Sequence, residues 1–232
     1  MKKIGILGGM SWESTSEYYR LINQYVSAEL GGLHSAEIII YSFDFHYIEA
    51  LLQQHKWDEI ANILTDGARK LVAAGAELLV IATNTAHKVA EEIEAHAGIP
   101  LIHIADATGE IIQNEGLRTV GLLGTSFTME EDFYRLRLRD KFGISVIIPD
   151  KSEREIVSDI IFQELILGKF EENSKRKYCK IIDNLAEAGA EGVILGCTEI
   201  PMLVKSDDTL VKLFDTTAIH ARKIVDVALG SN

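Results

Sequence analysis

The chain has 232 residues, of which 47% are hydrophobic and 25% are charged, and its formal net charge is −12. This composition is typical of a globular protein with one large or two small domains, and the acidic charge argues against a nucleic-acid partner. The sequence lacks both a signal peptide and an apolar run of about 18 residues, so we expect no membrane partner and a cytoplasmic location. Its two cysteines, Cys179 and Cys197, make no disulfide framework, which favours a reducing compartment.

Apolar runs alternate with helical patterns along the first part of the chain. The runs predict strands over residues 4–9, 36–45, 77–82 and 101–105. The intervening segments predict a helix up to Gly31, a helix over residues 57–74 and a helix that ends near Ala97. Ser11 is the expected N-cap of the first of these helices.

The same alternation then begins again. Strands are predicted over residues 119–124, 143–148, 193–195 and 211–214. We expect Thr128 with Glu131 and Ser152 with Glu155 to form capping boxes, and the second helix to reach Leu167. A further helix over residues 172–188 includes Cys179, whose side chain we expect in the core, and the C-terminal segment is helical. Asp106 and Asp215 are expected to cap helices.

A repeat relates the two parts. Ala-Gly-Ala-Glu occurs at 74–77 and 188–191, and Thr83 and Cys197 occupy equivalent places, because 188 exceeds 74 and 197 exceeds 83 by the same 114 residues. We therefore predict an α/β fold of two pseudo-symmetric domains, each a mostly parallel four-stranded sheet flanked by helices, with the active site in a cleft between them. The predicted domains are 1–98 with about 210–232, and 99–209.

Cys197 follows a buried strand and precedes a helix N-terminus. Gly196 is expected to allow a sharp turn there. Amide groups at a helix N-terminus favour negative charge, so we expect the pKa of this thiol to lie below about 8.5. The alternative is that Cys197 is simply a small buried residue.

Several segments together resemble the aspartate/glutamate racemase family: GILGGMSWEST, ATNTAHKV, HIADAT, GCTEIP and FDTTAIHA. The resemblance covers essentially the whole chain. It implies a cofactor-independent amino-acid racemase, a two-domain fold and a homodimer. It also implies that one cysteine on each side of the substrate exchanges the α-proton.

The chain departs from the family pattern at Thr83, which replaces the first cysteine. The resemblance implies that Cys197 removes the α-proton from the L-enantiomer and that Thr83 acts on the opposite face. Because a hydroxyl is a far weaker acid than a thiol, we expect an enzyme that favours L-substrates. A small-molecule binder without activity is the alternative.

Substrate-binding candidates follow the predicted strand ends. No metal or cofactor motif is evident, so hydrogen bonds must stabilise the carbanion. The candidate donors and orienting groups are Met10, Ser11, Asn84, Thr85, Thr125 and Thr198. Glu199 is expected to tune the thiol, to bind the substrate ammonium or to act only as a first-turn carboxylate. Trp12 lines the cleft or packs, and His87 either belongs to the Thr83 loop or faces solvent.

Aspartate or glutamate is the substrate that the resemblance implies, with neutral L-amino acids as the alternative. Family members that prefer aspartate bind its side chain with basic residues, but here Gln53 and Lys169 lie near the corresponding places. Isomerisation or decarboxylation of a small diacid is a further possibility. A nucleotide-binding protein is a weaker alternative, because the Gly5-x-x-Gly8-Gly9 run lacks the full dinucleotide-binding spacing.

Overall fold

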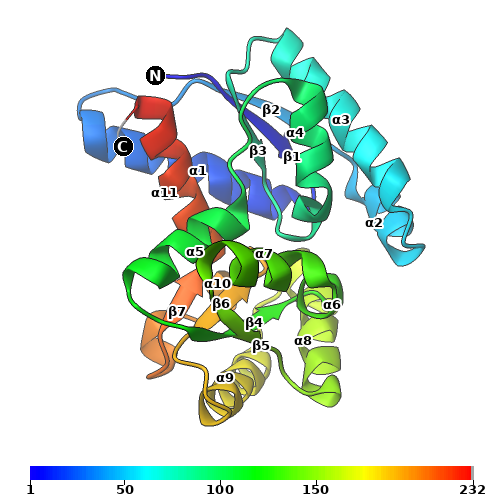
Figure 1. Ribbon diagram of the computed structural model, residues 1–232, viewed down its shortest axis with the longest axis vertical. Coiled ribbons are helices and arrows are strands. Elements are labelled where there is room, and N and C mark those ends of the chain that lie inside the picture. Colours follow the sequence, from blue (N-terminus) through cyan, green and yellow to red (C-terminus); the bar gives the residue numbers. More distant parts are fainter. Residues whose placement is uncertain (231–232) are drawn as a thin grey trace. The chain divides into compact units, whose positions relative to one another are not determined.

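The structure is a computed structural model that describes residues 1–230. The chain forms two compact units, of which the first comprises Met1–His103 with the segment from His220 onwards and the second comprises Ile104–Ile219. Figure 1 shows the course of the chain through both units. We expected the chain to cross between domains near residues 98 and 210. The two units instead divide after His103 and after Ile219, and the second division falls within a continuous helix, α11 (Thr216–Leu229).

The first unit contains a parallel sheet in which β1 (Ile4–Gly8) lies between β2 (Ile38–Ser42) and β3 (Leu78–Ile81). This sheet has three strands among the described residues, so the predicted fourth strand over residues 101–105 was wrong. Leu101 makes only an isolated bridge to Leu79, and helix α5 begins at Ile104. A short apolar run fits the first turn of a buried helix as well as a strand.

The second unit contains a four-stranded parallel sheet in the order β5-β4-β6-β7. Its strands are β4 (Thr119–Gly124), β5 (Ser145–Ile147), β6 (Val193–Gly196) and β7 (Leu213–Asp215). The first sheet has the same order, β2-β1-β3, with the Leu101 bridge in the place of β7. The two halves of the repeat therefore share one strand topology, and the predicted α/β fold with parallel sheets is confirmed.

Helices connect and cover the strands, as βαβ connections require. In the first unit α1 and α3 pack on β1, and in the second unit α8 and α9 pack on β4. The helical elements up to residue 130 are α1 (Trp12–Leu30), α2 (Phe45–Gln53), α3 (Trp57–Ala73), η1 (Thr85–Val89), α4 (Ala90–Ala97), α5 (Ile104–Asn114) and α6 (Ser126–Glu130). Those that follow are α7 (Asp132–Phe142), α8 (Lys151–Gln163), η2 (Leu165–Leu167), α9 (Glu172–Glu187), α10 (Ile200–Leu203), η3 (Ser206–Asp208) and α11.

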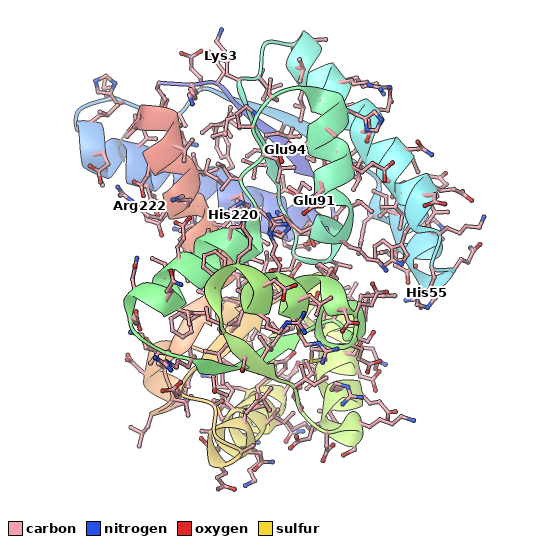
Figure 2. All side chains as sticks on the ribbon, in the orientation of Figure 1. Lys3, His55, Glu91, Glu94, His220 and Arg222 are labelled. Carbon is pink, nitrogen blue, oxygen red and sulfur yellow. The ribbon has the colours of Figure 1, made fainter. Side chains whose placement is uncertain are left out.

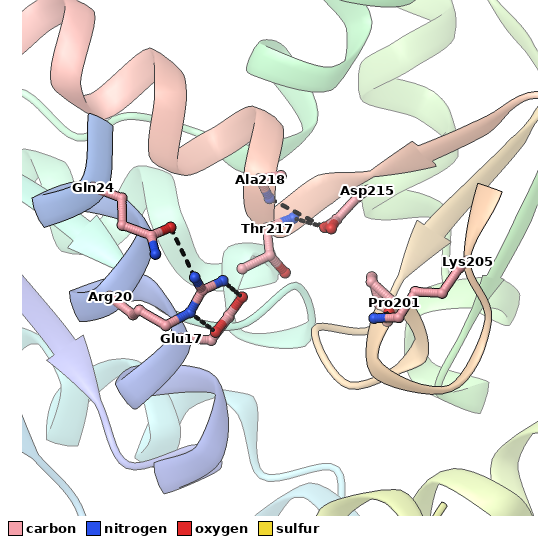
Figure 3. Close-up of polar contacts among 8 residues, drawn as sticks. All are labelled: Glu17, Arg20, Gln24, Pro201, Lys205, Asp215, Thr217 and Ala218. Atoms are coloured by element: carbon pink, nitrogen blue, oxygen red, sulfur yellow. Dashed lines mark hydrogen bonds and ion pairs between the residues drawn. The ribbon is translucent and has the colours of Figure 1, made fainter. Parts of the chain in front are cut away.

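Two predicted helix caps are confirmed. The Ser11 hydroxyl accepts the Ser14 N–H at 3.2 Å and so begins α1. The Asp215 carboxylate accepts the N–H groups of Thr217 and Ala218 at 2.9 and 3.1 Å and so begins α11 (Figure 3). Both caps satisfy N–H groups that have no partner within the helix.

Other expected caps were wrong. Thr125, not Thr128, is the N-cap of α6 and accepts the Thr128 N–H at 3.3 Å, while extended backbone at Glu131 separates α6 from α7. Asp150 replaces Ser152 as the N-cap of α8 and accepts the Glu153 N–H at 2.9 Å. In both cases an equally suitable oxygen lies two or three residues earlier in the chain, and sequence alone does not rank such neighbours.

Asp106 was also wrongly expected to cap a helix. Its side chain lies in the first turn of α5 and pairs with Arg137 at 2.5 and 2.9 Å and with Lys141 at 2.6 Å. Burial raises the pKa of Asp106, but the hydrogen bonds and charges of both bases outweigh burial and hold it below its usual value. The carboxylate therefore joins α5 to α7 instead of capping a helix.

Candidate functional site

Cys197 lies directly after β6, at the carboxyl end of the second sheet. The thiol Sγ donates to Glu199 Oε2 at 2.9 Å, and the Thr198 hydroxyl donates to the same oxygen at 2.7 Å. All three residues are buried, with 8%, 5% and 3% of their surface exposed in the order Cys197, Thr198, Glu199. One carboxylate oxygen therefore accepts two hydrogen bonds in a site largely shielded from water.

The surroundings of Cys197 raise the pKa of its thiol well above the ordinary value, so the expected lowering was wrong. Burial is the largest cause, followed by the charge and the hydrogen bond of Glu199. The N–H groups of Glu199 and Ile200 lower the pKa, as a helix N-terminus should, but they are outweighed. The resting pair is therefore a neutral thiol that donates to a carboxylate.

The packing around this loop keeps it in place. A Cβ atom at Gly196 would lie 2.9 Å from both the Leu123 carbonyl oxygen and Leu122 Cδ1, so this glycine is needed for close approach and not for a turn. Thr216 donates to the Leu195 carbonyl at 2.8 Å and so ties the end of β6 to the start of α11.

Tyr178 is a second ionisable group near the pair. It is fully buried and donates to the Val157 carbonyl at 3.2 Å. Burial, then the charges of Cys197 and Glu199, raise the pKa of its hydroxyl well above the ordinary value. This phenol therefore stays neutral and serves as packing near the thiol.

Thr83 occupies the equivalent place after β3 in the first sheet, and its side chain is half-buried. Asn84 and Thr85 follow it and are 2% and 8% exposed. Ser14 donates to the Ala82 carbonyl at 2.7 Å, which ties this loop to α1. The His87 ring bonds the Thr83 carbonyl through Nδ1 at 2.7 Å, and His87 is only 3% exposed, so the solvent-facing alternative was wrong.

His87 belongs to a buried polar cluster. Its ring meets those of His103 and His220 edge to face, with centroids 4.7 and 5.6 Å apart. His220, labelled in Figure 2, donates through Nε2 to the Ile102 carbonyl at 2.8 Å and accepts the Tyr18 hydroxyl on Nδ1 at 2.8 Å. Burial, then the charge of His87, lowers the pKa of His220 to about 3.

The remaining candidates fall into two groups. Met10 and Ser11 are buried after β1, the strand that pairs with β3, and Thr125 follows β4, which pairs with β6. The structure thus brings Met10, Ser11, Thr83, Asn84 and Thr85 to one sheet edge of the first unit. It brings Thr125, Cys197, Thr198 and Glu199 to one sheet edge of the second unit.

The other two candidates differ from these. Gln53 is exposed at the end of α2, and Trp12 is 67% exposed at the first position of α1. Lys169, the possible base for an acidic side chain, is also exposed and follows Gly168.

Sequence reasoning missed the residues that fix both loops. Ser14 and Thr216 donate to strand-end carbonyls, and His87 was left between two alternatives. Sequence position offered a signal only for His87, which lies four residues after Thr83. The carbonyls bonded by Ser14 and Thr216 lie 68 and 21 residues away in the sequence, so only the fold brings those groups together.

Within residues 1–230, no group of three His, Cys, Asp or Glu side chains is arranged to bind a metal ion. None of the helices over the same residues has the length and hydrophobicity needed to cross a bilayer.

Two parallel sheets with polar side chains at their carboxyl ends are typical of enzymes that act on small molecules. Residues 7–224 match the family model described as Asp/Glu/Hydantoin racemase, so the chain belongs to that family. Family membership supports an isomerase, namely an amino-acid racemase.

Similar proteins agree with this assignment. The chain is 26% identical over 233 residues to the broad specificity amino-acid racemase RacX of Bacillus subtilis (strain 168), with 98% of each chain covered. A Yersinia pestis structure with a provisional Asp/Glu racemase assignment is 54% identical and superposes with a TM-score of 0.92, covering 99% of this chain and 100% of that one. The structure of an aspartate racemase homologue from Pyrococcus horikoshii OT3 is 39% identical with a TM-score of 0.84, again covering 99% and 100%.

Proposed function

We propose that this protein racemises aspartate or glutamate without a cofactor, with Cys197 removing the α-proton of the L-enantiomer and Thr83 acting on the opposite face. The observation that supports this most directly is the buried hydrogen bond from Cys197 Sγ to Glu199 Oε2 at 2.9 Å. A thiol needs an acceptor for its own proton before it can take one from carbon, and Glu199 supplies that acceptor.

The proposed step on the Cys197 face conserves protons. Glu199 takes the Sγ proton, and the resulting thiolate takes the α-proton, so that Cys197 is again a thiol and the substrate is a carbanion. Because burial and the negative carboxylate raise the pKa of Cys197, the thiolate is formed only as substrate arrives. The positive α-ammonium group then offsets the negative charge within the site.

On the Thr83 face a proton is returned to the carbanion, either from the hydroxyl or from a water molecule that the hydroxyl positions. The alkoxide or hydroxide so formed takes a proton from solvent, and Glu199 gives its proton to solvent, which restores the resting site. Thr83 lies after β3 at the place that Cys197 has after β6. A hydroxyl is a much weaker acid than a thiol, so this step should be the slower one. We therefore expect exchange from L-substrates to outpace complete inversion.

Hydrogen-bond donors at the strand ends would bind the substrate carboxylate and stabilise the developing charge. We assign this role to the polar groups that surround the two loops, namely Met10, Ser11, Asn84, Thr85, Thr125 and Thr198. Trp12, because of its exposure, is proposed to cover the substrate, and Gln53 to bond its side chain.

Neutral L-amino acids are the second candidate substrates. This alternative is supported by the similarity to a racemase named for broad specificity and by the lack of an arginine near Gln53, where the sequence is Ala50-Leu51-Leu52-Gln53-Gln54.

The test is proton NMR of L-aspartate and L-glutamate in deuterium oxide with purified protein, beside a panel of neutral L-amino acids. Loss of the α-proton signal with wild type and not with Cys197→Ser is expected, and chiral chromatography of the same sample would measure inversion. If neutral substrates exchange faster than acidic ones, the acidic assignment is wrong. No exchange on any substrate would favour a small-molecule binder, or an enzyme that acts on a small diacid, over an amino-acid racemase.

We also propose a cytoplasmic homodimer that turns over without pyridoxal phosphate, as the family resemblance implies. Light scattering after size-exclusion chromatography would measure the subunit number. Turnover that survives dialysis against hydroxylamine would support independence from that cofactor, and loss of turnover would contradict it.

A further inference from the structure

We infer that His87 is the positioning residue of the Thr83 face. It holds the Thr83 hydroxyl in the position for proton transfer through the bond from its Nδ1 to the Thr83 carbonyl. This inference rests on the proposed function, in which His87 has so far been given no role. The Nδ1 to carbonyl distance is 2.7 Å. Because a carbonyl oxygen can only accept, Nδ1 must bear the proton, which fixes the tautomer of the ring.

The Thr83 loop is fixed by side chains at two successive peptides. Ser14 donates to the Ala82 carbonyl at 2.7 Å, and His87 donates to the next carbonyl, that of Thr83. Ser14 belongs to α1 and His87 to η1, so two different elements fix the backbone on either side of the Thr83 Cα atom. The direction of the Thr83 side chain follows from these two bonds.

The His87 ring cannot easily turn away from this carbonyl. It is 3% exposed and packs edge to face against His103 and His220. His220 is itself fixed at both ring nitrogens, by Tyr18 and by the Ile102 carbonyl. The buried histidine cluster therefore restrains the His87 ring, and the His87 ring in turn restrains the Thr83 loop.

The second half of the repeat has no histidine at the equivalent position. A shift of 114 residues places Pro201 at the position equivalent to His87, and proline has no side-chain donor. The Cys197 carbonyl instead accepts the backbone N–H of Ile200 at 3.2 Å. The carbonyl of the proton-transfer residue itself is therefore bonded by a side chain at Thr83 and by a backbone N–H at Cys197, where the side chain of Thr216 instead bonds the Leu195 carbonyl.

The position of Thr83 matters for the rate because its hydroxyl is only weakly acidic and proton transfer there is expected to be slow. Displacement of a reacting group by about 1 Å can cost about 100-fold in rate. We therefore expect loss of the His87 bond to slow proton exchange at the Thr83 face and to leave the Cys197 face largely intact.

The experiment compares His87→Phe, His87→Asn and His87→Gln, in the wild-type and Thr83→Cys backgrounds. Phenylalanine keeps the ring but lacks the donor, asparagine offers an N–H near the place of Nδ1, and glutamine offers it farther out. Deuterium incorporation is measured from the L-enantiomer for the Cys197 face and from the D-enantiomer for the Thr83 face. His96→Phe is the matched control, because exposed His96 makes the same kind of bond, from Nδ1 to the Glu92 carbonyl at 2.7 Å.

We expect His87→Phe and His87→Gln to lower D-side exchange about 10-fold or more, His87→Asn to restore most of it, and L-side exchange to change less than about 2-fold. Equal losses on both faces, with a lower melting temperature, would show a merely structural role and overturn the inference. Unchanged D-side exchange in His87→Phe would also overturn it. Histidine ¹⁵N NMR gives an independent check, since a proton on Nε2 of neutral His87 would contradict the bond whatever the activity.

Wild-type protein that exchanges no proton from either enantiomer would refute the proposed function itself. Wild-type exchange from L-substrates with unaltered D-side exchange in the His87 variants would refute only the role of His87.

Discussion

The loops after β3 and β6 stand at equivalent places in sheets of the same strand order, yet their acid–base groups differ. The Cys197 loop contains its own carboxylate, Glu199, within hydrogen-bond distance of the thiol. The Thr83 loop contains a hydroxyl in place of the thiol, and the backbone carbonyl of Thr83 is bonded by His87. One topology can therefore position two different proton-transfer groups, because the sheet fixes where a loop begins and the loop residues fix its chemistry.

The contrast extends to the cores of the two units. All seven histidines of the chain lie in the first unit, and three of them, His87, His103 and His220, are buried together. The second unit contains no histidine and buries Tyr134 and Tyr178 instead. Acid should therefore affect the two units differently.

The largest effect should come from Cys197→Ser. We expect L-side α-proton exchange to fall about 1,000-fold, because a serine hydroxyl cannot form the required base at neutral pH. Proton NMR in deuterium oxide measures this rate. Cys179→Ser is the matched control, since Cys179 lies in α9 and donates only to the Asp208 carbonyl at 3.7 Å. An equal loss in the control would contradict a specific role for Cys197.

Glu199→Gln should cost about 100-fold in L-side exchange near pH 8, because the thiol loses its proton acceptor. Removal of the negative charge should at the same time lower the pKa of Cys197, so the pH profile should move toward acid. A pH series of exchange rates separates the two effects. If Glu199 only raised the pKa, the variant would be faster than wild type at neutral pH.

Thr83→Cys should make the two faces more alike. We expect about a 10-fold gain in exchange from D-substrates, because a thiol is a much stronger acid than a hydroxyl. Deuterium incorporation from the D-enantiomer measures the gain, and Thr65→Cys, in α3 of the same unit and outside the strand-end loops, is the matched control. If D-side exchange does not increase in Thr83→Cys, the assignment of Thr83 to this face is wrong.

The pH dependence of stability should distinguish the two units. The pKa of His220 falls from 6.5 to about 3 on folding, so between these values the unfolded chain binds the extra proton. Stability that is present above pH 6.5 is therefore lost as the pH falls toward 3, by up to about 1.4 kcal/mol per pH unit. Denaturant unfolding of wild type and His220→Phe at pH 7 and pH 5 measures this slope, which should be smaller in the variant.

Hydrogen exchange by mass spectrometry would locate the same effect. Between pH 7 and pH 5, after correction for intrinsic rates, peptides of the first unit should lose more protection than peptides of Ile104–Ile219. Equal losses in both units would show that the buried histidines do not control the acid response.

Several local features could be predicted from sequence because they depend on neighbouring residues only. The strand end at Gly124 and the caps at Ser11 and Asp215 are examples. Others failed where two sequence neighbours competed, as with Asp150 and Ser152, or where an apolar run such as residues 101–105 suited either a helix or a strand. Exact caps and short strands depend on which backbone groups the rest of the fold leaves unpaired.

The sequence by itself determined the α/β class, the repeat and the placement of Thr83 and Cys197 after equivalent strands. These features follow from hydrophobic periodicity and residue spacing, which can be read directly from the sequence. Only the tertiary structure decided the protonation chemistry. The pKa of Cys197 is raised and not lowered, since burial and the neighbouring Glu199 carboxylate outweigh the helix N-terminus. His87 lies four residues after Thr83, a spacing that one helical turn brings together, but only folding buried its ring among two other histidines.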